Sequence, residues 1–235
     1  MPSGPSNHKD RMMCGRFTLR TPAAILAELF QLAEIPSWTP RYNIAPSQLA
    51  ATVVRTPEHL DRQFRAGRWG LIPAWAKNPG IGSRMINAQA ETASTTPAFR
   101  AAFKRRRCLV LADGFYEWQR LERRKQPFYI RMRDSSPFAF AGLWEHWKGP
   151  DGTGIDSCTL LTTDPNDLLR PLHHRMPVIL DPQDYDLWLD PGIQESERLQ
   201  PLLRPYASEE LMAFPVSTRV NNPAYDAPEC LEPVA

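Results

Sequence analysis

Prolines interrupt this chain along its whole length. Of the 235 residues, 24 are proline, which is about twice the usual share. A proline breaks a helix and is excluded from central strands, so scattered prolines predict short elements joined by many turns. Because 42% of the residues are hydrophobic, the chain can bury an ordinary core. The prolines therefore indicate turns rather than disorder.

The segments between these turns are more often strand-like than helical. A helix is predicted to begin at Pro22, with Thr21 as its N-cap, and to end before Pro36, with its apolar face between Ile25 and Ala33. Shorter helices are predicted at 97–104, 165–169, 182–189 and 196–203. Strands are predicted at 51–55, 63–69, 107–112, 115–119, 128–132, 138–144 and 157–162. This order, without a linker or internal repeat, predicts one mostly antiparallel α+β domain over 14–235 behind a disordered leader at 1–13.

The sequence argues against a membrane protein and against a secreted protein. The longest apolar runs, such as 108–112, are far shorter than a membrane span, and the polar first residues are followed by no signal-peptide core. The four cysteines lie far apart and form no CxxC pair, so we expect reduced thiols, no zinc site and a cytoplasmic location.

The net charge of +2 hides an uneven distribution. Residues 100–125 carry a net charge of +6, whereas residues 181–235 carry −8. This asymmetry favours a basic face directed at phosphates and an acidic face directed away from them. Two solvated surfaces would give the same pattern, so charge alone does not establish nucleic-acid binding.

Cys14 directly follows a second possible start, Met13. If synthesis began at Met13 and that residue were removed, Cys14 would carry a free α-amine beside its thiol. Such a 1,2-aminothiol condenses with an aldehyde to an imine and then to a stable thiazolidine ring, and both groups are partly nucleophilic at neutral pH. Thirteen residues block that amine in the chain as written. The alternative is that Cys14 is only a small buried side chain.

Three other segments contain candidate catalytic residues. Asn87 follows a Gly/Pro/Ser-rich loop, where it either holds an oxyanion or hydroxyl or caps a helix. Glu117 lies among aromatic residues that would raise its pKa and suit it to general acid catalysis, unless it pairs with a nearby arginine. His173 and His174 suit proton transfer, although two exposed loop histidines would look the same.

Arginine and aromatic residues occur together at 41–46 (RYNIAP) and 68–75 (RWGLIPAW). Aromatic rings that alternate with cations suit single-stranded nucleic acid, in which bases stack and phosphates pair. Core packing with arginines reaching the surface is the alternative.

Read in order, six segments resemble one family. They are 13–17 (MCGRF), 41–46 (RYNIAP), 69–73 (WGLIP), 86–92 (INAQAET), 113–118 (DGFYEW) and 173–177 (HHRMP). Their sequence and order are similar to the SOS response-associated peptidase family, whose members process abasic sites and crosslink to DNA. The resemblance extends from Cys14 to about Asn222, nearly the whole chain.

The resemblance implies a single α+β domain with a twisted, barrel-like sheet core, peripheral helices and a DNA groove. It implies that Cys14 attacks the ring-opened aldehyde of an abasic site in single-stranded DNA, with Asn87 holding the opened sugar and Glu117 transferring protons. His173 would assist ring-opening, β-elimination and crosslink reversal. Three residues would lie near the DNA backbone or the flanking bases: Arg16, Trp69 and Arg175. The resemblance also implies self-cleavage of the leader and lyase activity, and we expect a monomer without metal or cofactor.

Two departures from the family pattern matter. Gln89 stands where many members have arginine, which removes a charged phosphate contact, and Cys14 is not at position two. Two rival functions stay open at this point. One is a cysteine peptidase or amidohydrolase with Cys14 as nucleophile, His173 as base and Asn87 as orienting group. The other is a noncatalytic single-stranded nucleic-acid-binding module.

Overall fold

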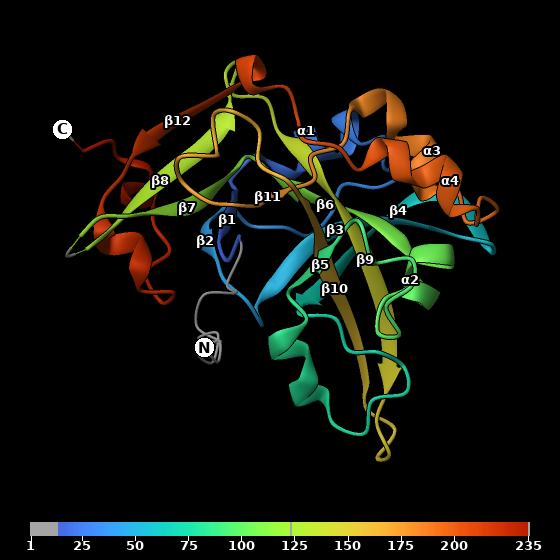
Figure 1. Cartoon of the computed structure of the whole chain (residues 1–235). Coiled ribbons are helices and arrows are strands. Elements are labelled where there is room, and N and C mark those ends of the chain that lie inside the picture. The colour runs from blue at the N-terminus through green and yellow to red at the C-terminus, as the bar shows by residue number, and fades with distance from the viewer. Residues whose placement is uncertain (1–13, 123, 235) are drawn as a thin grey trace, which may run out of the picture.

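The computed structural model describes residues 14–122 and 124–234, which form two sheets with helices at the periphery (Figure 1). The first sheet has five strands in the order β12-β8-β7-β1-β2, and all of its pairings are antiparallel. Its strands are β1 (Phe17–Leu19), β2 (Arg41–Ile44), β7 (Gly114–Arg120), β8 (Lys125–Met132) and β12 (Leu211–Pro215).

The second sheet has seven strands and closes on itself. Its order is β11-β10-β4-β3-β6-β9, and β9 pairs again with β10, so five strands form a ring. Its strands are β3 (Leu49–Thr56), β4 (His59–Trp69), β5 (Asn87–Gln89), β6 (Arg107–Ala112), β9 (Phe138–Lys148), β10 (Gly154–Thr163) and β11 (Met176–Pro177). Strand β10 runs parallel to β4 and β5, and the other pairings are antiparallel. The predicted α+β domain with a barrel-like, mostly antiparallel core is confirmed.

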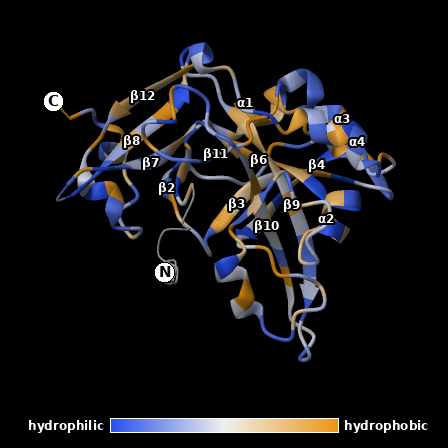
Figure 2. Ribbon diagram, viewed as in Figure 1, coloured by the Kyte–Doolittle hydropathy of each residue, from blue (hydrophilic) through white to orange (hydrophobic). Residues whose placement is uncertain are grey.

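The core lies between the two sheets and inside the ring, where hydrophobic strands gather (Figure 2). Every residue of β6 is buried, as its continuous apolar run predicts for a strand covered on both faces. Phe17 of the first sheet packs edge-on against Trp69 and Phe140 of the second, with ring centroids 5.0 and 6.0 Å apart. Such edge-to-face aromatic packing joins the two sheets.

The helices are short, as the frequent prolines predict. They are α1 (Ala23–Leu29), α2 (Arg100–Arg105), α3 (Tyr185–Leu189) and α4 (Ser196–Leu199). Single 3-10 turns lie at Pro79–Arg84, Pro182–Asp184, Gln200–Leu202, Ser208–Glu210, Thr218–Asn221 and Pro228–Leu231. Within the described residues, none of the helices has the length and apolar character needed to cross a membrane.

Two local predictions were wrong. Helix α1 begins at Ala23 and ends at Leu29, and the hydroxyl of Thr21 donates to Asp113 at 2.5 Å instead of capping the helix. Residues 165–169 form turns rather than a helix, because the Asn166 side chain accepts a hydrogen bond from the Leu169 N–H and donates one to the Tyr206 carbonyl. Local side-chain bonds of this kind compete with helix formation. The leader predicted at 1–13 lies outside the described residues.

Candidate functional site

Strand pairing brings Cys14 against Glu117. Strand β1 pairs with β7 so that Phe17 lies opposite Phe115, and the Tyr116 N–H donates to the Arg16 carbonyl at 3.0 Å. Continuing this register places Gly15 opposite Glu117, so Cys14 lies one residue from that position. The backbone nitrogen of Cys14 donates to Oε1 of Glu117 at 3.0 Å. The first sheet therefore holds this nitrogen and this carboxyl group together.

The carboxyl group of Glu117 is shielded from water, with the residue only 2% exposed. Burial raises its pKa to about 8, although the N–H groups of Cys14 and Trp118 pull in the opposite direction. The carboxyl group contacts the Cys14 nitrogen, and among the arginines that the structure describes none forms an ion pair with it. The arginine pairing considered as an alternative is therefore not what the structure shows. A carboxyl group in this state exchanges protons near neutral pH.

The Cys14 thiol is also buried, with 1% of the residue exposed. Burial, followed by the neighbouring charge of Glu117, raises the pKa of this thiol well above its usual range. A thiol in such surroundings is a poor source of thiolate on its own. Proton removal by a neighbouring base is what would make it nucleophilic.

Asn87 lies in strand β5, so it does not cap a helix. Strand β5 pairs with β10, with Asn87 opposite Leu160. Asn87 is half-buried, and Gln89 lies two residues further along the strand and is exposed. Since residues i and i+2 share one face of a strand, the side chain that replaces the family arginine lies on the same face as Asn87.

Trp69 links β1, which follows Cys14, to the residue just before β5, which contains Asn87. Its ring packs against Phe17, and its indole N–H donates to the Ile86 carbonyl at 2.8 Å. The side chain is completely buried. The expected contact between Trp69 and DNA therefore finds no support in this packing, because the ring is a core element that positions two site strands.

His173 lies in the turn between β10 and β11. Its ring stacks on His174, with centroids 4.3 Å apart, and its Nδ1 accepts from the Arg175 N–H at 3.2 Å. Burial, then the neighbouring His174, lowers the pKa of His173, and Arg120 at the end of β7 acts in the same direction. His173 is half-buried while His174 is exposed, so the two are not simply a pair of exposed loop histidines. A neutral imidazole of this kind accepts protons.

Arg175 is held by acidic side chains. Its guanidinium contacts both carboxylate oxygens of Glu91, at 3.0 and 2.7 Å, and Oδ1 of Asp164 at 3.0 Å. It also donates to the Thr162 carbonyl at 2.6 Å. The Arg175 side chain is only 11% exposed, so a phosphate would have to compete with these partners.

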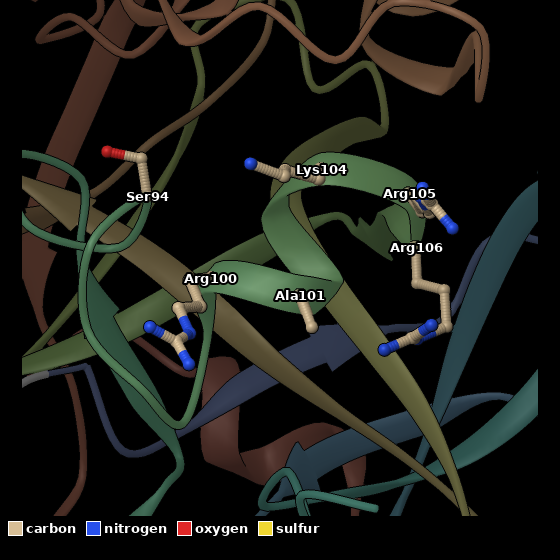
Figure 3. A pocket seen from close by; sticks show the side chains of 6 residues that line it. All are labelled: Ser94, Arg100, Ala101, Lys104, Arg105 and Arg106. Carbon is tan, nitrogen blue, oxygen red and sulfur yellow. The ribbon is translucent and has the colours of Figure 1, made fainter.

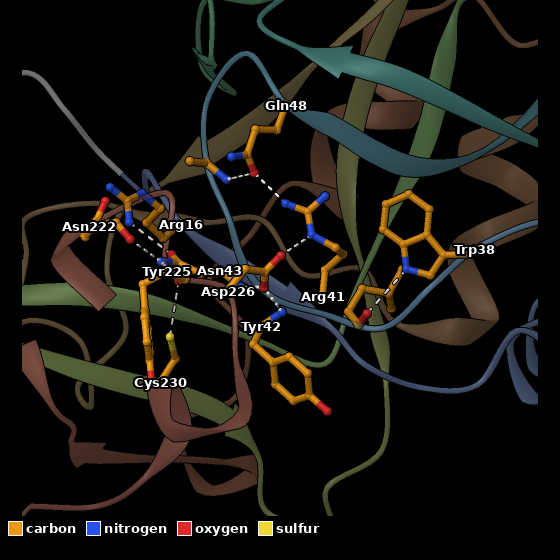
Figure 4. A network of polar contacts seen from close by, with 12 residues as sticks. Arg16, Trp38, Arg41, Tyr42, Asn43, Gln48, Asn222, Tyr225, Asp226 and Cys230 are labelled. Atoms are coloured by element: carbon orange, nitrogen blue, oxygen red, sulfur yellow. Dashed lines mark hydrogen bonds and ion pairs between the residues drawn. The ribbon is translucent and has the colours of Figure 1, made fainter. Parts of the chain in front are cut away.

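Arg16 belongs to a polar network that anchors the C-terminal segment (Figure 4). Its guanidinium donates to Oδ1 of Asn43 at 3.0 Å and to the Val220 carbonyl at 2.6 Å. Asn43 also donates to the Tyr225 carbonyl at 2.8 Å, and Asp226 accepts from the Asn43 N–H at 2.9 Å. The half-buried Arg16 therefore has structural partners in addition to any role in binding DNA.

Two tryptophans, Trp75 and Trp118, have part of their surface exposed, and neither was among the residues predicted to lie near the DNA. Trp118 follows Glu117, is half-buried and donates its indole N–H to Oδ1 of Asn221 at 2.7 Å. The Arg16 guanidinium lies 5.9 Å from its ring centroid. Trp75 is 62% exposed. The alternation of aromatic residues and arginines was the available signal, but it did not distinguish the buried Trp69 from these two.

The structure holds the Cys14 nitrogen against a buried carboxyl group that titrates near neutrality, and a half-buried imidazole lies in the turn between β10 and β11. These are the groups that a condensation between an amine and a carbonyl compound requires. Among the described residues, no group of three or more His, Cys, Asp or Glu side chains is placed to hold a metal ion.

Comparison with known proteins gives independent evidence on the family of this chain. The family described as SOS response associated peptidase (SRAP) matches residues 13–223. The chain is 43% identical over 224 residues to abasic site processing protein YoqW of Bacillus subtilis (strain 168), which covers 94% of the chain and 99% of that protein. It is 34% identical over 224 residues to abasic site processing protein HMCES of Xenopus tropicalis, covering 83% of the chain and 66% of that protein.

Solved structures share the fold. A protein from Bacteroides thetaiotaomicron matches with a TM-score of 0.83 and 23% identity, covering 94% of this chain and 100% of that one. A protein from Bordetella bronchiseptica matches with a TM-score of 0.74 and 28% identity, covering 87% of this chain and 100% of that one.

Proposed function

The chain belongs to the SOS response-associated peptidase family, and from this premise we propose that it processes abasic sites in single-stranded DNA by forming a covalent crosslink through Cys14. The observation that carries the proposal is the 3.0 Å contact between the Cys14 nitrogen and the buried carboxyl group of Glu117. After removal of the preceding residues, that nitrogen is an α-amine next to a proton donor and acceptor.

The reaction proceeds in two bond-forming steps. The amine nitrogen attacks the aldehyde carbon of the opened sugar, and the carbinolamine loses its hydroxyl as water when protonated Glu117 supplies a proton. This loss leaves an iminium ion and an ionised Glu117, which accepts the thiol proton. The sulfur then attacks the iminium carbon, and the π electrons of the C=N bond become the lone pair of the ring nitrogen. One water leaves overall, and the product is a thiazolidine. The pKa of about 8 at Glu117 suits both transfers near neutral pH.

Asn87 and His173 act on the sugar in this proposal. The Asn87 amide holds a hydroxyl of the opened sugar, because an amide can both donate to a hydroxyl and accept from it. The neutral imidazole of His173 takes the sugar hydroxyl proton that ring-opening releases. The same base removes the proton next to the imine carbon, which expels the 3′ phosphate and gives the lyase activity.

Four residues are candidate DNA contacts. In this proposal Arg16 and Arg175 offer cations to the phosphates, and exposed Trp75 and half-buried Trp118 offer ring faces to the bases. Trp69 is not included, because its side chain is buried.

The same carboxyl group would serve self-cleavage of the leader. Hydrolysis of the Met13–Cys14 peptide bond adds water across the bond, and the departing nitrogen needs a proton. Glu117 contacts that nitrogen, so it is placed to supply the proton as a general acid.

Intact-mass spectrometry tests the proposal. A version of the chain that begins at Met13, and loses that methionine, is mixed with single-stranded DNA bearing one abasic site. We expect an adduct one water lighter than the sum of the two masses. A matched version with one uncleavable residue before Cys14 keeps the thiol and blocks the amine, so it is expected to form no adduct.

The rival functions give different results. A peptidase or amidohydrolase that uses the thiol alone keeps its activity when the amine is blocked, and the raised thiol pKa argues against it. A binding module binds DNA reversibly with or without Cys14 and forms no adduct. If the unblocked version forms no adduct, the crosslinking proposal is wrong.

A further inference from the structure

In the part of the chain that the structure describes, several cations form ion pairs with acidic side chains, but two cations on one side of α2 do not. Arg55 and Arg62 pair with Asp186, and Arg106 pairs with Glu145. Arg100 and Lys104 are exposed, and no carboxylate within the described residues lies at ion-pair distance from either side chain. Unpaired cations that lie together raise the local potential and attract anions.

These two side chains line a hollow. Its volume is about 400 Å³, and Ser94, Ala101, Arg105 and Arg106 complete its lining. Arg100 and Lys104 project from the side of α2 that faces the segment carrying Ser94, whereas Arg105 projects from the other side (Figure 3). Residues four apart on a helix are neighbours, so the two cations and the Ser94 hydroxyl border one space.

Two further cations of the basic run, Arg106 and Arg107, have structural roles. The Arg107 guanidinium is buried and donates to five carbonyls, those of Phe103, Lys104, Trp188, Asp190 and Ile193. Arg106 is half-buried and bound to Glu145 at 2.7 Å. The net positive charge of the sequence run is thus divided between buried cations and exposed ones, and Arg100 and Lys104 are among the exposed cations that a ligand can reach.

A continuous series of turns connects β5, which carries Asn87, to α2. Ala93 N–H bonds to the Gln89 carbonyl at 2.9 Å, Thr96 N–H to the Thr92 carbonyl at 2.9 Å, and Arg100 N–H to the Thr96 carbonyl at 2.8 Å. Glu91, which holds Arg175, and Ser94 lie three residues apart in this segment, a spacing that puts side chains about 5–6 Å apart in a helical turn. The chain therefore runs from Asn87 past Glu91, the partner of Arg175, to the hollow.

We propose that this hollow binds a backbone phosphate of the DNA strand on one side of the lesion, with Arg100 and Lys104 as cations and the Ser94 hydroxyl as an additional donor. The inference rests on the proposed function for the identity of its ligand. The proposal predicts that the two arms of the DNA strand bind differently, because only the arm that passes α2 gains this phosphate contact. It also supplies phosphate-binding charge close to Gln89, where the family arginine is absent.

Reversible binding to single-stranded DNA tests the proposal with the full chain. The probe carries a stable abasic analogue without an aldehyde, and it has either a long 5′ arm or a long 3′ arm. The variant R100Q/K104Q removes both cations, and R133Q/R204Q removes the same charge from the acidic C-terminal half. Thermal unfolding shows whether each variant is folded.

We expect R100Q/K104Q to weaken binding of one probe and not the other. Each phosphate contact contributes about 0.7 to the slope of log K against log salt concentration for single strands. Because one phosphate contact is lost, that slope becomes shallower by about 0.7 for the affected arm. R133Q/R204Q leaves it unchanged. Equal loss on both arms, or loss matched by the control, overturns the proposal.

Failure of the crosslinking chemistry is a separate result. If the unblocked wild-type chain forms no adduct but R100Q/K104Q still weakens one arm, the phosphate site stands without the proposed reaction. If adducts form at saturating DNA and the variant binds both arms as the wild type does, the reaction stands and the phosphate site is wrong.

Discussion

The Cys14 nitrogen and Oε1 of Glu117 lie 3.0 Å apart, although 103 positions separate the two residues in the chain. The contact follows from the pairing of β1 with β7, in which Phe17 lies opposite Phe115. A shift of one residue in this register would turn every side chain of β7 to the opposite face. The position of Glu117 beside the Cys14 nitrogen is therefore fixed by the sheet and by the packing of Phe17 and Phe115 in the core.

The buried Glu117 makes stability depend on pH. Its pKa is about 8 in the folded chain but near 4.3 when exposed. The folded chain binds the Glu117 proton more tightly than the unfolded chain does. This preference contributes its full stability below about pH 4.3, and the contribution is lost as the pH rises to about 8. We expect the free energy of unfolding, measured with urea, to fall by a few kcal/mol over this range, and Glu117→Gln to remove most of the fall.

The matched control is the chain with a free amine at Cys14. Its ammonium group would favour the ionised carboxylate, so its stability should fall less between these pH values. An identical pH dependence in wild type and Glu117→Gln, both with the amine blocked, would show that Glu117 is not the titrating group.

Glu117→Gln is also expected to slow crosslinking. The amide keeps the size of the side chain but neither donates an acidic proton nor accepts one from the thiol. General acid–base catalysis contributes about 10²- to 10⁴-fold, and a loss in that range is expected in a time course of adduct formation. An unchanged rate would assign proton transfer to another group.

Arg107 is expected to affect folding rather than DNA binding. Its pKa falls to about 10 because of burial, with Asp190 opposing the shift, and its guanidinium satisfies five carbonyls around α2 and α3. Arg107→Ala leaves these carbonyls without their donor, so we expect a loss of at least about 3 kcal/mol in urea unfolding. The salt dependence of DNA binding should stay unchanged while the variant is folded. A shallower salt slope at unchanged stability would contradict this assignment.

Arg107 also shows how far sequence alone reaches. Strands with a continuous apolar run, such as β6, and the barrel-like α+β core were predictable because hydrophobic pattern reports burial. The sequence did not show which of the neighbouring cations are buried, because the burial of Arg107 and the exposure of Lys104 depend on which elements pack over them. Likewise, Trp69 and Trp75 lie in one segment, yet the first is buried and the second exposed. Short strands such as β5 were missed, since three residues carry no period and their pairing depends on β10.

His174 is expected to influence the proton affinity of His173. Burial is the first cause of the lowered pKa of His173, and the adjacent His174 is the second. His174→Phe keeps an aromatic ring to stack and removes the charge, so the pKa of His173 should rise towards its ordinary value. NMR titration of the His173 ring measures this. A lower pKa keeps His173 neutral at more acidic pH, so the acidic limb of strand cleavage should move to higher pH in the variant.

Arg120 gives the comparison for that experiment, because it also lowers the pKa of His173 from the end of β7. Arg120→Gln tests the cation alone. If the pKa of His173 is the same in His174→Phe and in wild type, burial with Arg120 accounts for the shift and His174 has no part in it.

Asn221 is expected to position Trp118 for DNA. The Trp118 indole N–H donates to Oδ1 of Asn221 at 2.7 Å, and Arg16 lies over the same ring. In Asn221→Ala the ring loses this bond and samples other orientations, so less of the population presents its face to a base. A hydrogen bond contributes about 1 kcal/mol, which corresponds to about fivefold weaker binding of a single-stranded probe with the non-reactive abasic analogue.

The control removes the same bond from the other side. Trp118→Phe keeps a ring but lacks the indole N–H, so Asn221→Ala should have little further effect in its presence. Equal effects of Asn221→Ala in the wild-type chain and in the Trp118→Phe variant would mean that the Asn221 side chain acts elsewhere. The backbone carbonyl of Asn221 accepts from Arg16 at 3.3 Å. Because alanine keeps that carbonyl, dependence of the loss on the indole N–H separates positioning of Trp118 from general support of the C-terminal segment.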